Sequence, residues 1–247
     1  TGYNITGLMV GSEGTLGVLD QVILKLIPAP KARQAMVAVY DTIEQASETV
    51  AGIISARIVP ATLEILDNFT IRAVEDFSKA GLPKDAAALL LIEVDGHPAV
   101  VAEEAEQVKA LCLKMGARTI DQAKDDAQRD RIWAARRAAL SALAQLKPTL
   151  VLEDATVPRS RIPDMVRALQ EIGKKYKIDI GTFGHAGDGN LHPTSSRTEE
   201  TKKNFTGWNR PLKRSLTRPW PWEAPFPEST APALPKPLFW RRKPGIP

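Results

Sequence analysis

The chain has 247 residues, enough for one large domain or two smaller ones. Its contents of 43% hydrophobic and 25% charged residues are ordinary for a globular protein, and it holds no apolar run of the roughly 18 residues that a transmembrane segment needs. The net charge of +4 comes from residues 195–247, which hold 11 Lys+Arg against 4 Asp+Glu, so the body gives no reason to expect a nucleic-acid partner.

Residues 1–30 begin with a glycine-rich loop and continue into Gly17–Ile27, whose β-branched content predicts a strand that ends at Pro28 and Pro30. Strands and helices then alternate, which predicts an α+β domain with a sheet covered by helices. We expect strands over residues 35–40, 61–66, 88–94, 150–153 and 176–183. We expect helices over residues 42–55, 69–80, 99–115, 123–146 and 159–175.

The run Gly184-His-Ala-Gly-Asp-Gly-Asn-Leu-His192 holds two of the three histidines on either side of a glycine-rich turn. A buried strand that runs into such a bend can aim both imidazoles, His185 and His192, into one pocket. Converging imidazoles are typical of a divalent metal site. The alternative is a tight turn whose histidines only bond to the backbone. His97 lies in a separate turn and is expected to be structural.

The loop Gly11-Ser12-Glu13-Gly14-Thr15 precedes the first expected strand, and its backbone N–H groups could approach a phosphate or a ribityl chain. It is neither a Walker loop nor the dinucleotide fingerprint. Without further information, a tight hairpin turn is the favoured interpretation of this loop.

Arg136 follows Trp133 by three positions, so both side chains are expected on one helical face. A guanidinium suits a bidentate grip on a substrate carboxylate, and the alternative is a solvated surface arginine. We expect Glu153 and Asp154 to be a surface pair at the end of a strand. Cys112 lies in an apolar helical stretch, is expected to be core packing, and fits a reducing, cytoplasmic setting.

Residues 195–247 hold 10 of the 19 prolines and 4 of the 5 tryptophans. A disordered Pro-rich segment is one interpretation, but such tracts are usually poor in tryptophan. A shifted reading frame is the interpretation we favour. With a one-base shift, synonymous codons for Pro221–Thr230 permit Leu-Gly-Gly-Thr-Leu-Ser-Gly-Glu-His-Gly. We therefore expect an aberrant, frame-shifted tail, and the DNA around codon 194 tests this hypothesis.

Several of these motifs keep one family's order and rough spacing: Thr1–Thr6, Val10–Gly17, Ile132–Arg137, Leu152–Arg161 and the Gly184–His192 run. Together they resemble the C-terminal domain of FAD-linked oxidases of the vanillyl-alcohol oxidase type, in the branch of glycolate oxidases and D-lactate dehydrogenases. The resemblance covers residues 1–194 and then stops. The glycine-rich segment that a shifted frame permits is of the kind that this family carries next.

The resemblance implies an antiparallel, ferredoxin-like sheet over residues 31–194, preceded in residues 1–30 by the last strands of an FAD-binding domain. It implies that Thr1, Gly2 and Tyr3 form part of the flavin-binding wall together with the loop residues Gly11, Ser12, Glu13, Gly14 and Thr15. Because members place most of the FAD domain before this point, we expect the chain by itself to hold FAD weakly. Since it starts at Thr1 without a methionine, we expect that its start is not the start of the gene.

The resemblance further implies that His185 and His192 bind Zn²⁺ or a similar ion, which acts as a Lewis acid on the substrate while hydride passes to the flavin. Arg136, rather than Arg137, would hold the substrate carboxylate, Asn190 would orient the substrate or the flavin edge, and Asp188 would brace the turn or a histidine. The third metal ligand and the base would come from the Glu-His-Gly that the frame change removes.

The implied substrate is a small 2-hydroxy acid, because Leu140 and Leu152 stand where a 2-hydroxyglutarate site would have polar groups. Electrons would leave to an acceptor protein or quinone, or to an Fe–S subunit, in a cytoplasmic or membrane-peripheral setting. With its altered tail, the chain as given is expected to be inactive. One rival is a non-catalytic metal-binding or interaction domain with a Pro-rich, partner-binding tail. A second is a PLP or NAD enzyme, which the missing strand–Gly-x-Gly-x-x-Gly–helix unit disfavours.

Overall fold

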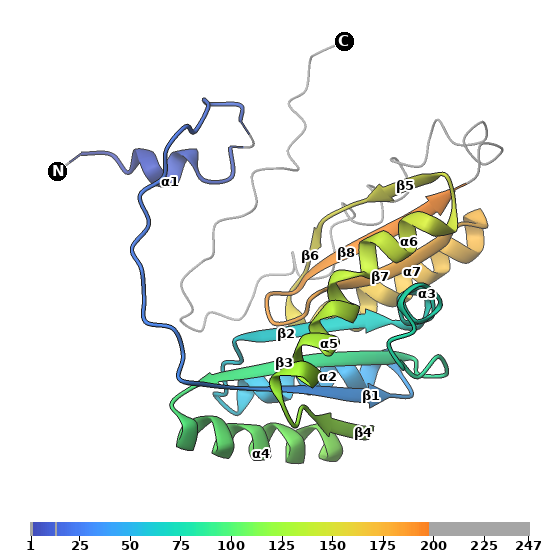
Figure 1. The fold of residues 1–247 in the computed structure, drawn as a ribbon. Helices are drawn as coiled ribbons and strands as arrows, with labels where there is room; N and C mark the ends of the chain where they lie inside the picture. Colours follow the sequence, from blue (N-terminus) through green and yellow to red (C-terminus); the bar gives the residue numbers. More distant parts are fainter. Residues whose placement is uncertain (1, 13, 198–247) are drawn as a thin grey trace, which may run out of the picture. The chain divides into compact units, whose positions relative to one another are not determined.

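A computed structural model describes residues 2–12 and 14–197 (Figure 1). The chain divides into two compact units, residues 1–30 and residues 31–247. No helix within the described ranges is long and apolar enough to cross a membrane. The tail that we interpret as frame-shifted lies outside the described residues, apart from residues 195–197.

The first unit contains one short helix, α1 (Ile5–Met9), whose first turn is capped by the Asn4 side chain. The strand that we expected over Gly17–Ile27 is not formed. A strand needs a hydrogen-bonded neighbour, and no described residue pairs with this segment. Its apolar side chains are therefore exposed, with Ile23 fully so.

The second unit is built around an 8-stranded sheet in the order β4-β1-β3-β2-β7-β8-β5, with β6 paired to β8. All seven strand pairings are antiparallel. Its strands are β1 (Ala32–Tyr40), β2 (Thr62–Asp67), β3 (Ala88–Gly96), β4 (Ala117–Gln122), β5 (Thr149–Leu152), β6 (Ala155–Thr156), β7 (Asp179–His185) and β8 (Asn190–Arg197). Its helices are α2 (Ile43–Ser55), α3 (Asn68–Ser78), α4 (Pro98–Lys114), α5 (Asp126–Arg137), α6 (Ala139–Leu146) and α7 (Ile162–Tyr176), with a 3₁₀ turn at Arg159–Arg161.

The first four strands have the neighbour order β4-β1-β3-β2 and are joined largely through helices. This is the split βαββαβ arrangement of a ferredoxin-like unit, with α3 as an additional helix between β2 and β3. The hairpin of β7 and β8 then extends the sheet from the free edge of β2. The antiparallel, helix-covered sheet that we expected is therefore present.

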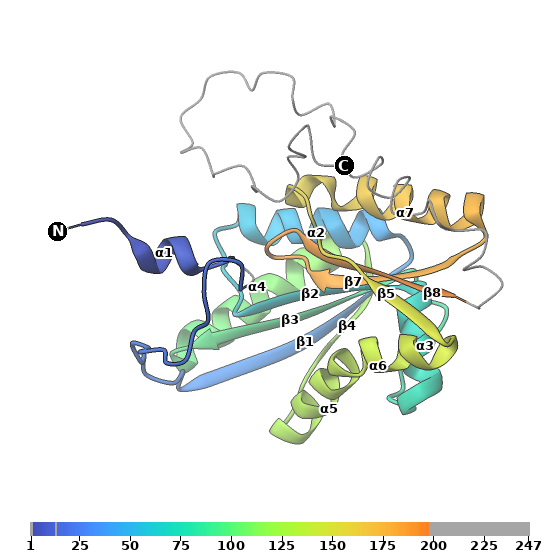
Figure 2. The same cartoon turned by 90° about the horizontal axis from the view of Figure 1, so that it is seen from above.

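Helices cover both faces of the sheet (Figure 2). α2, α4 and α7 pack on one face over a core that includes Tyr40, Ile92 and Leu169. α3, α5 and α6 pack on the other face over a second core that includes Leu66, Leu89 and Leu143. Apolar residues recur along every central strand, so each strand contributes to both cores, as expected when both faces are covered.

Two parts of the second unit differ from the sequence-based expectation. The single helix expected over 123–146 is two helices, α5 and α6, which meet at Ala138. The break lets α5 bury Ala135 against the sheet while α6 turns Ala139, Ala142 and Leu143 onto α3. β4, β6 and β8 were not predicted, because each is short or rich in polar residues. β8 runs to Arg197, three residues beyond the expected boundary at 194.

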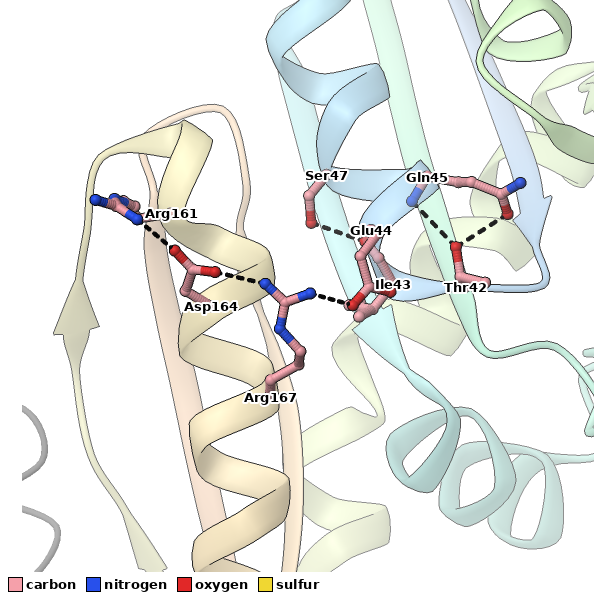
Figure 3. Close-up of polar contacts among 8 residues, drawn as sticks. All are labelled: Thr42, Ile43, Glu44, Gln45, Ser47, Arg161, Asp164 and Arg167. Atoms are coloured by element: carbon pink, nitrogen blue, oxygen red, sulfur yellow. Dashed lines mark hydrogen bonds and ion pairs between the residues drawn. The ribbon is translucent and has the colours of Figure 1, made fainter.

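A chain of charges joins α2 and α7 near their first turns (Figure 3). Arg167 on α7 donates to Asp164 of its own helix and, over 2.7 Å, to Glu44 on α2. Arg161 donates to the other oxygen of Asp164 at 2.7 Å. These guanidinium groups, Arg161 first, hold the pKa of the Asp164 carboxyl below its usual range. The Thr42 hydroxyl accepts from the Gln45 amide and caps α2.

Candidate functional site

The glycine-rich turn that carries the two histidines closes the β7–β8 hairpin, and it needs glycine at two positions. Gly189 has a φ of +75°, and a Cβ there would lie 2.0 Å from the Val157 carbonyl oxygen. A Cβ on Gly184 would lie 2.5 Å from the Asn190 carbonyl oxygen. The backbone can therefore fold back this tightly only without side chains at these points.

The bend brings the two imidazoles together, as the sequence predicted. The ring centroids of His185 and His192 are 5.1 Å apart, and the rings are nearly perpendicular. His192 also lies 5.5 Å from the Phe183 ring. The alternative interpretation, in which these histidines bond only to the backbone, is wrong, because each ring bonds to a carboxylate.

The carboxylate beside His185 belongs to Glu64 on β2. Nδ1 of His185 lies 2.5 Å from Oε1 of Glu64. Glu64 is buried, with 6% of its side chain exposed, although His185 is half-exposed. The second histidine has an exposed partner, since Nδ1 of His192 lies 2.6 Å from Oδ1 of Asp154. Within the described residues, no hydrogen bond or ion pair engages Nε2 of either ring.

Arg136 on α5 reaches the same buried carboxylate. Its Nε and Nη2 lie 2.8 Å and 2.7 Å from Oε2 of Glu64, and its side chain is 14% exposed. Its guanidinium carbon lies 4.8 Å from the centre of the Phe183 ring. Arg136 is thus not a solvated surface arginine. Glu64 stands between it and His185 and contacts both.

Trp133 turns to the sheet on the same helical face as Arg136, as its spacing predicted. Its indole Nε1–H donates to Oε2 of Glu93 on β3 over 2.7 Å. Glu93 is buried as well. The carboxylates of Glu64 on β2 and Glu93 on β3 therefore bind Arg136 and Trp133 and fasten α5 to the sheet.

Strand register explains why residues far apart in sequence meet here. Glu64 is paired directly with His185 across β2 and β7, and Phe183 with His192 across β7 and β8. Directly opposed residues on antiparallel strands point to the same face. Glu64 and His185 therefore lie in one cross-strand row with Asn190, and Phe183 and His192 lie in the next row, on the face that α5 covers and at the end where β7 turns into β8.

The family model for the C-terminal domain of FAD linked oxidases matches residues 29–210. The chain belongs to this family. Among curated relatives, glycolate oxidase subunit GlcD of Bacillus subtilis (strain 168) is 52% identical over 193 residues, which are 78% of this chain and 41% of that protein. GlcD of Escherichia coli (strain K12) is 40% identical over 192 residues, which are 78% of this chain and 38% of that protein.

A D-lactate dehydrogenase of Anaerostipes hadrus is 32% identical over 201 residues, covering 78% of this chain and 42% of that protein. This chain thus spans less than half the length of each of these relatives. In fold it is similar to an alkyldihydroxyacetonephosphate synthase (TM-score 0.60, 19% identity, 88% of this chain and 48% of that one). It is also similar to p-cresol methylhydroxylase with bound substrate (TM-score 0.56, 13% identity, 72% and 42%). The resemblance to FAD-linked oxidases is confirmed.

The remaining site residues of this FAD-linked oxidase domain have mixed outcomes. The Asn190 side chain accepts from the Thr156 hydroxyl at 3.1 Å, and the residue is partly buried at the rim of the hairpin. The Asp188 side chain makes no hydrogen bond or ion pair with any described residue, so the expected brace is not seen. Asp154, rather than Asp188, contacts His192. This corrects our interpretation of Asp154 and Glu153 as a surface pair.

A cavity of about 170 Å³ lies between α5 and the sheet on this same face. Its walls are mainly apolar, and the charged residues at its border are Arg131 and Arg136. The apolar lining comes from Val37, Leu66, Ala80, Leu82, Leu89, Leu91, Ile132 and Ala135. Arg136 therefore lies between an apolar space and the Glu64 carboxylate.

The expected flavin-wall residues lie in the first unit, and two of them, Thr1 and Glu13, fall outside the described residues. Gly2 and Tyr3 lie before α1, and Tyr3 is almost fully exposed. The loop itself is a tight turn in which the Thr15 amide donates to the Ser12 carbonyl at 2.9 Å. Gly11 and Gly14 have φ of +78° and +76°, which explains both glycines.

Across residues 2–12 and 14–197, no group of three or more His, Cys, Asp or Glu side chains is arranged to hold a metal ion. Of the three metal ligands that we expected, His185 and His192 are among the described residues, and the third, expected from a shifted frame, lies outside them. Sequence reasoning missed Glu64 and Glu93. The available signal was an acidic residue inside each of two otherwise apolar strands, Leu63–Leu66 and Leu89–Val94.

Proposed function

We propose that this chain is the substrate-side part of an FAD-dependent oxidoreductase that converts a small 2-hydroxy acid, glycolate or D-lactate, to the 2-oxo acid. The observation that carries the proposal is the cluster formed by Arg136, Glu64, His185 and His192 on one face of a domain of this family. A cation that suits a carboxylate lies beside two imidazoles that suit a hydroxyl or a metal ion.

The spacing of the histidine pair supports the proposal of a divalent ion. Two imidazoles that share one tetrahedral ion at about 2.1 Å have ring centroids roughly 5 Å apart, and these rings are 5.1 Å apart. Each Nδ1 contacts a carboxylate, the arrangement that orients metal-bound histidines. When bound, the flavin would take the substrate's hydride and the ion would polarise its hydroxyl.

The chain's own residues would bind and orient the acid. A guanidinium carries five N–H donors, and Glu64 occupies those on Nε and one on Nη2. The edge formed by Nη1 and Nη2 remains for the substrate carboxylate. Asn190, partly exposed at the hairpin rim, would orient the hydroxyl-bearing end of the acid. The hydroxyl proton would pass to a base, and the hydride would carry the two electrons, so that a 2-oxo acid remains.

The substrate would be small and carry one carboxylate. Leu152 pairs with Thr194 and so points to the same face as His192, but it offers no polar group to a second carboxylate. Leu140, on α6, is equally apolar and partly exposed. Both places favour glycolate or lactate over a dicarboxylic acid such as 2-hydroxyglutarate.

The first unit would take part in flavin binding. We propose that residues 1–30 supply the last part of an FAD-binding domain, with Gly11, Ser12, Gly14 and Thr15 against the cofactor. Support comes from the two left-handed glycines, which carry no side chain and so let the backbone of this turn approach a ligand closely. Electrons would then pass to an acceptor protein, a quinone or an Fe–S subunit.

Anaerobic flavin reduction tests the proposal in the longest protein that the gene encodes. We expect flavin absorbance bands that glycolate or D-lactate bleaches and that 2-hydroxyglutarate bleaches at least tenfold more slowly. Arg136→Lys should raise KM for the acid, because one ammonium cannot replace a planar fork. A protein that binds Zn²⁺ without flavin, and whose tail captures partners, would instead support a non-catalytic metal-binding domain.

A further inference from the structure

The buried carboxylate of Glu64 is shared between two groups of the site. Its Oε2 accepts from Nε and Nη2 of Arg136, and its Oε1 contacts Nδ1 of His185 at 2.5 Å. We propose that Glu64 is a positioning residue, which fixes His185 as the Nδ1–H tautomer and aims its unprotonated Nε2 into the site.

The direction of the His185 bond follows from the bond to Arg136. An arginine side chain only donates hydrogen bonds, so Oε2 of Glu64 is an acceptor. A carboxylate that pairs with arginine is ionised and has no proton to give, so Oε1 is an acceptor as well. Nδ1 of His185 must then be the donor, and in the neutral ring Nε2 carries the lone pair.

The placement of Glu64 makes this constraint rigid. It lies on β2, between β3 and β7 in the sheet, and it is paired directly with His185 across the ladder. Only 6% of its side chain is exposed, so water does not compete freely for the carboxylate. By contrast, Asp154 beside His192 is 67% exposed, and its hold on that ring is correspondingly weaker.

One carboxylate therefore couples the two halves of the site. Glu64 leaves the Nη1 side of Arg136 open for a substrate carboxylate. It also fixes the lone pair of His185 on Nε2, where a hydroxyl or a metal ion would bind. Both binding functions therefore depend on Glu64. The consequence for a metal ion rests on the proposed function. The tautomer of His185 does not, since it follows from the described contacts alone.

The chain is well suited to the test, because it has only three histidines. Long-range ¹H–¹⁵N correlations of the ¹⁵N-histidine-labelled chain, at about two pH units above the ordinary imidazole pKa of about 6.5, report which ring nitrogen is protonated. We expect Nδ1–H for His185. His97 is an internal reference of the opposite kind, because its Nδ1 accepts from the Ala99 amide at 3.4 Å.

Glu64→Gln should invert the His185 tautomer. The amide oxygen must face the donors of Arg136, which leaves the amide NH₂ facing His185, so Nδ1 has to accept and the proton moves to Nε2. Glu93→Gln is the matched control: it changes the other buried carboxylate of this face, whose partner is Trp133, and should leave His185 unchanged. Asp154→Asn should alter His192 only.

Zn²⁺ titration of the same variants adds a second readout. Glu64→Gln should weaken the zinc affinity about 10–100-fold, the usual effect of losing a carboxylate behind a histidine ligand, while Glu93→Gln should leave it unchanged. If the wild-type chain, which supplies two of the three expected ligands, binds no zinc, the tautomer of His185 alone decides the present inference.

Two results would overturn the role of Glu64. The first is a wild-type His185 protonated on Nε2, a measurement that needs no variant and stands even if Glu64→Gln fails to fold. The second is a folded Glu64→Gln chain, checked by near-UV circular dichroism, in which His185 keeps its proton on Nδ1.

Discussion

The two faces of the sheet use the same strands for different purposes. The face under α2, α4 and α7 buries an apolar core, in which residues such as Ile92, Leu169 and Ile162 are almost fully shielded. The face under α3, α5 and α6 has an apolar core as well, but beside it lie Glu64, Glu93 and the residues that they contact. The face under α2, α4 and α7 mainly stabilises the fold, whereas part of the face under α3, α5 and α6 forms a polar site.

The polar face tolerates its buried charges because each of them has a partner. Glu64 contacts Arg136 and His185, and Glu93 accepts from Trp133. Replacing such a buried network by apolar side chains is often neutral or stabilising, whereas breaking one partner is costly. These groups are therefore better explained by what they position than by what they contribute to stability.

Removing the Arg136 charge should give the largest effect. Arg136→Met keeps the length of the side chain but leaves Glu64 buried without its cation, and we expect a loss of about 3–5 kcal/mol in the free energy of unfolding. Urea denaturation of the chain measures it. Adding Glu64→Gln to Arg136→Met should recover part of the loss, and strictly additive losses would contradict a paired, buried charge.

A cavity created by mutation in the apolar core under α7 tests whether the two faces of the sheet are independent. Leu169→Ala on α7 removes a side chain that is 1% exposed, and we expect a loss of about 2–5 kcal/mol in the free energy of unfolding. The His185 tautomer should not change, because no atom of the polar face is touched. A change in His185 at a pH and temperature where the variant is folded would show that the two faces are coupled.

The fold was largely predictable, because its signals are local. Strand and helix periods marked most of β1–β3, β5 and β7 and the helices α2–α4 and α7. The misses have physical causes. Gly17–Ile27 has the composition of a strand, but no described residue pairs with it. In β8, polar residues flank the proline on both sides. The break at Ala138 comes from the packing of α6 against α3 rather than from a proline or glycine.

The site was only half predictable, because its partners are distant in sequence. The hairpin histidines and Arg136 came from motifs and spacing. Their carboxylates, Glu64 and Asp154, lie 121 and 38 residues from His185 and His192, and only strand register brings them together. The acidic residue Glu64 in an apolar strand was the only sequence signal for a buried carboxylate, and that signal did not indicate which residues it would contact.

A second buried acid on β2 gives the next prediction. Burial raises the pKa of Asp67 from 3.8 to about 6, although its oxygens accept from the Thr70 and Thr182 amides at 2.9 and 2.8 Å. The folded state therefore binds a proton more tightly than the unfolded state. Stability is highest below about pH 4 on this account, and about 3 kcal/mol is lost as the pH rises past 6.

Asp67→Asn isolates that contribution. It removes the titrating group and keeps an oxygen to cap α3, so the difference in unfolding free energy between the variant and the wild type should shift in the variant's favour by up to about 3 kcal/mol between pH 4 and pH 7. Urea denaturation at both pH values measures the difference. An unchanged difference would mean that Asp67 is hydrated or ionised at low cost.

The charge chain between α2 and α7 should give the smallest effect, although it belongs to the apolar face. Arg167 and its partner Glu44 are both partly exposed, at 50% and 38%. Water screens such pairs, so Arg167→Met should cost about 0–1 kcal/mol. A double-mutant cycle with Glu44→Gln measures the pair itself. A coupling above about 1 kcal/mol would mean that α7 is held by this charge chain as well as by its apolar face, whose Leu169 and Ile162 we expect to dominate.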